Sequence, residues 1–231
     1  SLYKENYDAS TDESFVKTVE LYKSDVEILL KITILLTYYG GEIYSNLILK
    51  IMSRIMPRDK SIYLLYYPLY LMYYVVIITG IESKNYKVLE DVLQLDIVRT
   101  INMRSYYDEN NLLVNTCDNM VNLMEDYGVF FPENNYKYPL SEYLYKELQP
   151  LIDDFLYVGD EYPELFMSTE ILISCFYAIK NYREDEKQVW GPLGRYTYQM
   201  LYTKKQIESF PVNKIIEKLK LYTNVSNKDD F

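Results

Sequence analysis

Apolar residues recur every three or four positions through most of the chain, a spacing that predicts α-helices nearly throughout. The first stripe runs from Phe15 to Leu36 and follows the sequence STDE, a capping-box pattern with Ser10 as N-cap and Glu13 at N3. Gly40-Gly41 is expected to end this helix. Further helices are expected at about 42–56, 67–79, 86–95, 112–127, 141–155, 162–183, 196–210 and 213–222.

Proline, glycine and serine mark where several of these helices begin and end. Pro57 is expected to stop the second helix, and Gly80 to close the third. Ser141 is the expected N-cap of the sixth helix, in which Pro150 predicts a kink. Pro163 lies near the start of the seventh helix, where its missing N–H costs little.

This pattern predicts an all-α fold, an irregular antiparallel array of about eight or nine helices with over 60% of the residues helical. A regular solenoid is not expected, because the chain shows no self-similarity at a fixed period. We expect a single domain with two lobes, at about 10–95 and 111–223, a connecting segment at 96–110, and a frayed tail at 224–231. The expected buried residues include Val26, Leu29, Leu30, Leu69, Met72, Val76, Ile171 and Phe176.

Residues 62–81 carry no formal charge, and this length meets the criterion for a transmembrane helix. Six of these residues are tyrosines, whose hydroxyl groups would need hydrogen-bond partners in hydrocarbon. Pro68 is tolerated only near the start of a helix, so the helix is expected to begin near Tyr67, too short to span a bilayer. We therefore predict a core helix.

The composition excludes several catalytic mechanisms and metal sites, and it argues against one class of binding partner. The 231 residues include 28 tyrosines and no histidine, which excludes Ser-His-Asp and Cys-His mechanisms and histidine-bearing zinc sites. The net charge of −10 argues against a large nucleic-acid interface. Cys117 and Cys175 lie in apolar segments without metal-binding spacing, and are expected to be small buried residues in a reducing compartment.

Acidic residues cluster at one predicted turn, where Asp153 and Asp154 precede Gly159 and Asp160-Glu161 follow it. Paired carboxylates can bind a divalent metal or act as general acid and base, so Asp153, Asp160 and Glu161 are the residues of a possible metal-dependent enzyme. Adjacent acids on a helix diverge by about 100°, which favours solvated turn charges instead.

The segment WGPLGRY holds the single tryptophan, Trp190, followed by Arg195 and Tyr196 at a predicted helix start. Trp190 is expected either to fill the core, with Arg195 paired to an acidic residue, or to anchor a protein partner. In the first case Trp190→Ala would cost about 3–5 kcal/mol of stability. Trp190, Arg195 and Tyr196 are the candidate interaction residues.

Three stretches resemble a helical region found C-terminal to effector domains in large bacterial proteins associated with antiphage defence, including sirtuin-like, Toll/interleukin-receptor-like and Schlafen-type DNA-binding proteins. The stretches are 21–41, an amphipathic helix ending at a Gly turn; 67–93, with its YP start and apolar helix; and WGPLGRYTYQ at 190–199. The resemblance implies an all-α, non-catalytic region for sensing, packing or oligomerisation, and transfers no catalytic residue.

Together these observations predict a non-catalytic helical interaction or regulatory domain without a cofactor. The chain begins Ser1-Leu2, so we expect a fragment of a larger bacterial, cytoplasmic protein. Its expected partners are proteins, either other domains of the parent chain or further copies of itself, with no strong nucleic-acid binding and no membrane. The alternatives are the carboxylate-based metal-dependent enzyme and an acidic inhibitor that occupies a basic site on another protein.

Overall fold

The structure is a computed structural model that describes residues 11–57, 63–93, 123, 125–180 and 194–195. Within these residues 84% are helical, six α-helices are present and there are no strands, which confirms the all-α prediction. The expected helices at 196–210 and 213–222, and most of the one at 112–127, lie outside the described residues. The α-helices are α1 (Asp12–Tyr39), α2 (Ser45–Ile55), α3 (Tyr67–Glu82), α4 (Tyr86–Leu93), α7 (Pro139–Leu156) and α8 (Tyr162–Lys180), with 3-10 turns η1 (Gly41–Tyr44), η2 (Tyr63–Tyr66), η3 (Asp126–Phe130) and η4 (Gly159–Glu161).

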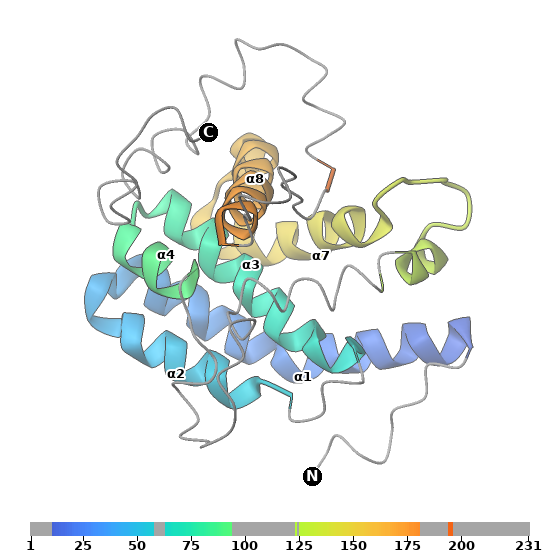
Figure 1. Cartoon of the computed structure of the whole chain (residues 1–231), viewed down its shortest axis with the longest axis horizontal. Coiled ribbons are helices and arrows are strands. Elements are labelled where there is room, and N and C mark those ends of the chain that lie inside the picture. The colour runs from blue at the N-terminus through green and yellow to red at the C-terminus, as the bar shows by residue number, and fades with distance from the viewer. Residues whose placement is uncertain (1–10, 58–62, 94–122, 124, 181–193, 196–231) are drawn as a thin grey trace, which may run out of the picture.

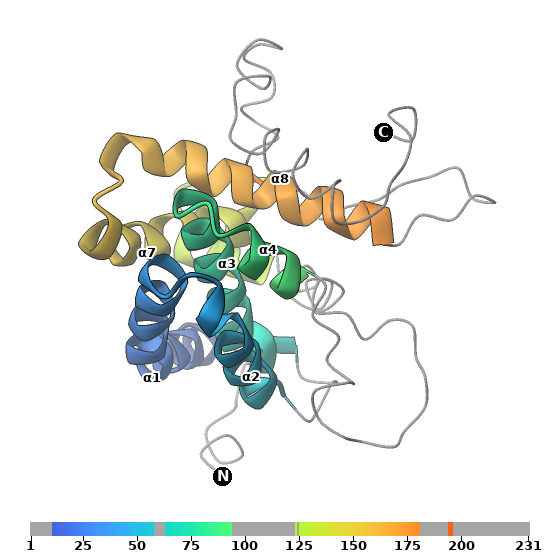
Figure 2. The ribbon, with the colours of Figure 1, turned by 90° about the vertical axis from the view of Figure 1, so that its left-hand side faces the viewer.

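Helix α3 lies at the centre of the molecule. It packs against α1, α2, α4, α7 and α8, with α1 and α2 below it and α8 above it in both views (Figures 1 and 2). Every residue from Tyr67 to Ile81 is buried, with Pro68 in the first turn. The segment Tyr63–Glu82 is long and apolar enough to cross a membrane, but 94% of its most apolar window is buried inside the protein. This burial supports the prediction of a core helix.

The capping box of α1 lies one residue later than predicted. Thr11, not Ser10, is the N-cap, and Ser14 takes the N3 position expected for Glu13. The Ser14 amide donates to Thr11 Oγ1 at 3.2 Å, and the Thr11 amide donates to Ser14 Oγ at 3.1 Å. The Ser14 hydroxyl reaches the N-cap amide as a glutamate at N3 would. The sequence therefore contains two overlapping capping patterns, one residue apart, and the structure forms the second.

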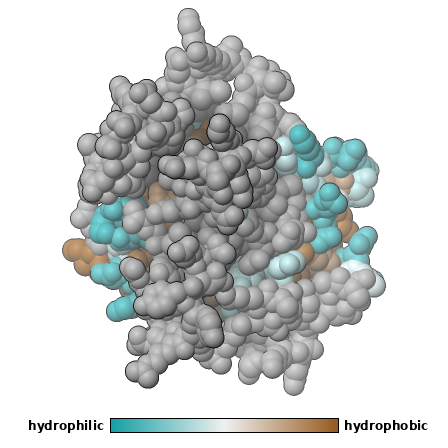
Figure 3. All heavy atoms as spheres, viewed as in Figure 1, coloured by the Kyte–Doolittle hydropathy of each residue, from teal (hydrophilic) through white to brown (hydrophobic). Residues whose placement is uncertain are grey.

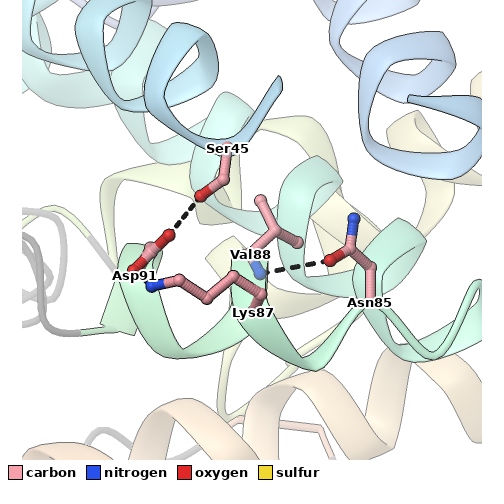
Figure 4. A network of polar contacts seen from close by, with 5 residues as sticks. All are labelled: Ser45, Asn85, Lys87, Val88 and Asp91. Atoms are coloured by element: carbon pink, nitrogen blue, oxygen red, sulfur yellow. Dashed lines mark hydrogen bonds and ion pairs between the residues drawn. The ribbon is translucent and has the colours of Figure 1, made fainter. Parts of the chain in front are cut away.

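The end of α1 and the start of α2 follow from the glycine pair. Gly40 caps α1 as predicted, and Gly41 adopts a left-handed φ of 57°. The chain then forms the 3-10 turn η1, so α2 begins at Ser45 instead of residue 42. The buried Ser45 hydroxyl hydrogen-bonds the Asp91 carboxylate of α4, which also pairs with Lys87 (Figure 4).

Asn85 fixes the junction between α3 and α4. Its Oδ1 accepts from the Val88 amide at 3.2 Å (Figure 4), and its Nδ2 donates to the Thr37 carbonyl in the last turns of α1 at 3.1 Å. One side chain therefore caps α4 and ties it to α1.

Gly80 does not close α3, contrary to the prediction. The helix continues to Glu82, and the chain turns at Lys84, whose φ is 56°. A Cβ atom on Gly80 would lie 2.8 Å from Leu89 Cδ2 of α4. Gly80 therefore serves the close approach of α4 to α3.

Two further predictions on helix ends need correction. Helix α7 begins at Pro139, and Ser141 lies inside its first turn, where its hydroxyl contacts α8 instead of capping. The helix predicted at 112–127 does not continue as an α-helix to Tyr127, because residues Asp126–Phe130 form the 3-10 turn η3. Pro150 lies inside α7, and the kink predicted there stays a prediction.

Seven of the eight residues predicted to be buried are buried, and Leu29 is only partly buried. Leu29 lies toward the edge of the core-facing side of α1, beside the exposed Ile28.

We predict that Glu82→Gln raises the melting temperature at pH 7. Partial burial and, secondarily, the charge of Glu161 raise the pKa of the Glu82 carboxyl above 4.5. A carboxyl whose pKa is raised by folding destabilises the fold once it ionises, as the pH rises from the unfolded pKa through the folded pKa. The gain in melting temperature from Glu82→Gln should therefore disappear at a pH below both the folded and the unfolded pKa of Glu82. Glu133→Gln, on an exposed loop, is the control. An equal gain at every pH would contradict the assignment.

Candidate functional site

Helix α1 carries an exposed apolar face in addition to its buried one. Ile28, Ile32, Leu35 and Tyr39 are 73%, 45%, 41% and 70% exposed, and we call these four residues the α1 seam. Their spacing of four, three and four residues places them along one side of the helix, as in the a and d positions of a coiled coil. The buried side, which faces the core, holds Phe15, Val19, Tyr22, Val26, Leu30 and Ile34.

The exposed apolar surface continues past the end of α1. Ile43 in η1 is 85% exposed and Leu47 in α2 is 43% exposed. Figure 3 shows apolar atoms at the left edge of the molecule, where the turn between α1 and α2 lies in Figure 1. Several exposed apolar side chains close together in the sequence are typical of protein contact sites.

The second candidate site is the contact made by Arg195, the one predicted interaction residue that the structure describes. The Arg195 amide donates to Ser141 Oγ at 2.9 Å. Its guanidinium carbon lies 3.4 Å from the centre of the Tyr145 ring, and its Nη1 is 3.8 Å from Glu142 Oε2. The prediction that Arg195 pairs with an acidic residue is confirmed. Trp190 and Tyr196 lie outside the described residues, so their roles stay predictions.

Glu170 completes this contact from α8. It is 4% exposed and accepts a hydrogen bond from Ser141 Oγ. A Cβ atom on Gly194 would lie 2.1 Å from Glu170 Oε1, so only glycine fits there without moving the carboxylate. Gly194 and Arg195 thus contact both α7 and α8, and these contacts serve the packing of the fold. We call Ser141, Glu142, Tyr145, Glu170 and Arg195 the Arg195 cluster.

A pocket of about 460 Å³ lies between α1, η3 and α7. Two of its charged lining residues, Glu20 and Glu147, pair with Lys23 beside the pocket, and the Tyr143 hydroxyl donates to Glu20 at 3.2 Å. Burial lowers the pKa of Lys23, but the hydrogen bonds and charges of Glu147 and Glu20 outweigh it and raise the pKa. The pocket is lined by Glu20, Phe130, Phe131, Pro132, Glu133, Asn134, Tyr143, Lys146 and Glu147.

The predicted carboxylates do not gather around a common point. Asp153 Oδ1 accepts from the Gly159 amide at 2.9 Å, while Asp160 and Glu161 are exposed in η4. Among the described residues there is no group of three or more histidine, cysteine, aspartate or glutamate side chains that could hold a metal. Asp153 therefore has the role of stabilising the turn after α7.

Cys175 is a free thiol on α8 and is partly buried, not fully buried as expected. Burial raises the pKa of this thiol, which opposes formation of a nucleophilic thiolate. Cys117 lies outside the described residues.

Of these sites, the sequence indicated only the Arg195 contact. The α1 seam was missed because its residues belong to a helix whose apolar stripe was assigned entirely to the core. The signal that was present is the segment 28–36, in which seven of nine residues are isoleucine or leucine, more than one buried face requires. Comparison with family models, curated proteins and solved structures found no match to this chain.

Proposed function

We propose that this chain is a non-catalytic helical domain that works by binding another protein segment through the α1 seam. The observation that carries the proposal is the exposure of Ile28, Ile32, Leu35 and Tyr39 along one side of a helix whose other side is already buried in the core. An exposed a/d-type stripe is the pattern that a partner helix covers.

The proposal extends to a regulatory role in a larger bacterial, cytoplasmic protein, in which contacts of this domain would hold or release a catalytic domain. The resemblance of residues 21–41, 67–93 and 190–199 to helical regions of defence-associated proteins supports this part. The first of these stretches contains the α1 seam, so the resemblance and the exposed surface coincide.

Neither alternative has comparable support. The contact of Asp153 with the turn amide does not favour a metal-dependent enzyme. An acidic inhibitor would act through exposed carboxylates that match a basic site, and on α1 the exposed Glu20 and Glu27 pair with Lys23 and Lys31 of the same helix.

We predict that Ile32→Glu abolishes binding and leaves the fold intact. Ile32 is half-exposed, so a glutamate there is solvated in the free protein but would be buried without a partner in the complex. The tagged chain is co-expressed with a second copy carrying another tag, and separately with any further segments of the same gene, and capture is measured.

Wild-type capture of at least one of these segments, lost in Ile32→Glu, is the expected result. Asn135→Glu is the control, because Asn135 is an exposed polar residue on a loop outside α1. Equal capture by Ile32→Glu and the wild type, with unchanged circular dichroism, would contradict the proposal.

A further inference from the structure

We propose that the α1 seam binds the α1 seam of a second copy of this chain, with the two helices antiparallel about a twofold axis between Ile32 and Leu35. This inference rests on the proposed function and names its partner. Its basis is the order of spacings along the seam, which is four, three and four residues and therefore reads the same in both directions.

The symmetric spacing makes the seam self-complementary. In an antiparallel pair, Ile28 lies opposite Tyr39 of the second copy and Ile32 opposite Leu35 of the second copy, and each contact occurs twice. A twofold interface requires this reciprocity, in which residue i contacts j and j contacts i. In this register each a position of one helix lies opposite a d position of the other. The side chains of one helix can then fill the spaces between those of the other.

The flanking residues are compatible with this register. Leu29 and Leu36 are partly buried and flank one side of the seam, where each would face the other across the pair. Lys31 flanks the opposite side and would face the Tyr38 ring of the second copy, so the two Lys31 charges are not opposed. Lys31 is already paired with Glu27 at 2.6 Å, which limits its net charge at the contact.

The exposed area of the seam is that of a weak contact. The four seam side chains, 41% to 73% exposed, present on the order of 500 Å² per copy. Complete mutual burial would remove at most about 1,000 Å² from solvent, which is in the range of weak, transient interfaces. We therefore expect the dimer to have a dissociation constant in the micromolar range, so that free chains with an exposed seam are also present.

Sedimentation velocity of the whole chain, over a range of micromolar concentrations, tests the dimer. The wild type should shift from monomer to dimer as its concentration rises. Leu35→Glu places two carboxylates beside the twofold axis and should weaken dimerisation at least tenfold. Asn135→Glu, at an exposed loop position outside α1, should dimerise like the wild type. Thermal melting by circular dichroism checks that each variant is folded.

Cross-linking tests the register. In a background with Cys117→Ser and Cys175→Ser, a chain carrying Ile28→Cys is mixed with one carrying Tyr39→Cys and treated with a short thiol cross-linker. The mixed pair should cross-link. Ile28→Cys alone should not, because the two copies of residue 28 would lie roughly 16 Å apart along the helix axis.

The outcomes separate this inference from the proposed function. A chain that stays monomeric but still captures another segment of its gene through the seam would overturn the second copy as partner and leave the proposed function standing. Cross-linking of Ile28→Cys to itself would overturn the antiparallel arrangement. A dimer unaffected by both Ile32→Glu and Leu35→Glu would overturn the seam as the dimer interface, and capture by Ile32→Glu would still decide the proposed function.

Discussion

Replacing Phe166 with alanine should destabilise the protein by about 3–5 kcal/mol, the usual cost of removing a phenyl ring from a packed core. Phe166 is completely buried on α8. Its ring centre lies 5.5 Å from that of Tyr74, 5.3 Å from that of Tyr145 and 6.0 Å from that of Tyr162. The alanine variant would leave a cavity where α3, α7 and α8 meet and would also lose these ring contacts, each worth about 0.5–1.5 kcal/mol.

Urea unfolding followed by circular dichroism measures this effect. Tyr157→Ala is the matched control, because this aromatic residue is 88% exposed and should change stability by less than about 0.5 kcal/mol. Its φ is 54°, and since tyrosine and alanine both carry a Cβ atom, backbone strain stays the same in the control. Equal unfolding midpoints for Phe166→Ala and the wild type would show that the three helices do not meet at this ring.

The sequence was most informative where local chemistry determines structure. Pro68 and the uncharged run around it predicted a central helix starting near Tyr67, and that helix is α3. Gly40-Gly41 predicted the end of α1, because glycine adopts the left-handed backbone that Gly41 shows. Each of these signals depends only on residues within one or two turns.

The sequence was least informative where the role of a residue depends on a contact with a residue on another helix. Gly80 has the signature of a helix stop, but its role is to admit Leu89 of the next helix. Ser141 has the signature of an N-cap, but its hydroxyl contacts Glu170, 29 residues away. Spacing cannot reveal such contacts, because they depend on how the helices pack.

The α1 seam shows a different limit of sequence patterns. Isoleucine and leucine occupy Ile28, Leu29 and Leu30 in succession, so the apolar pattern fits more than one orientation of the helix. Only packing against α3 determines that Leu30 is buried and Ile28 is exposed. Periodicity identified the helix, and tertiary contacts determined which of its two apolar faces remains free.

Arg195→Met should destabilise the protein by about 2–3 kcal/mol, because it leaves the Glu142 carboxylate without its cation. Glu142 is buried, with 9% of its side chain exposed, and breaking a buried ion pair from one side costs more than the pair itself contributes. The distance of 3.8 Å and the partial exposure of Arg195 place the expected loss below that of a fully buried pair.

Two further variants separate the charge of Arg195 from its packing. Glu142→Gln combined with Arg195→Met removes both charges and should recover part of the stability, since a neutral amide is less costly to bury. Arg195→Lys keeps the charge but loses the planar stacking on Tyr145, where the guanidinium carbon lies 3.4 Å from the ring centre, and should fall between wild type and Arg195→Met. If Arg195→Met unfolds at the wild-type urea concentration, the contact of Arg195 with α7 does not stabilise the fold, and this residue is free to serve a partner instead.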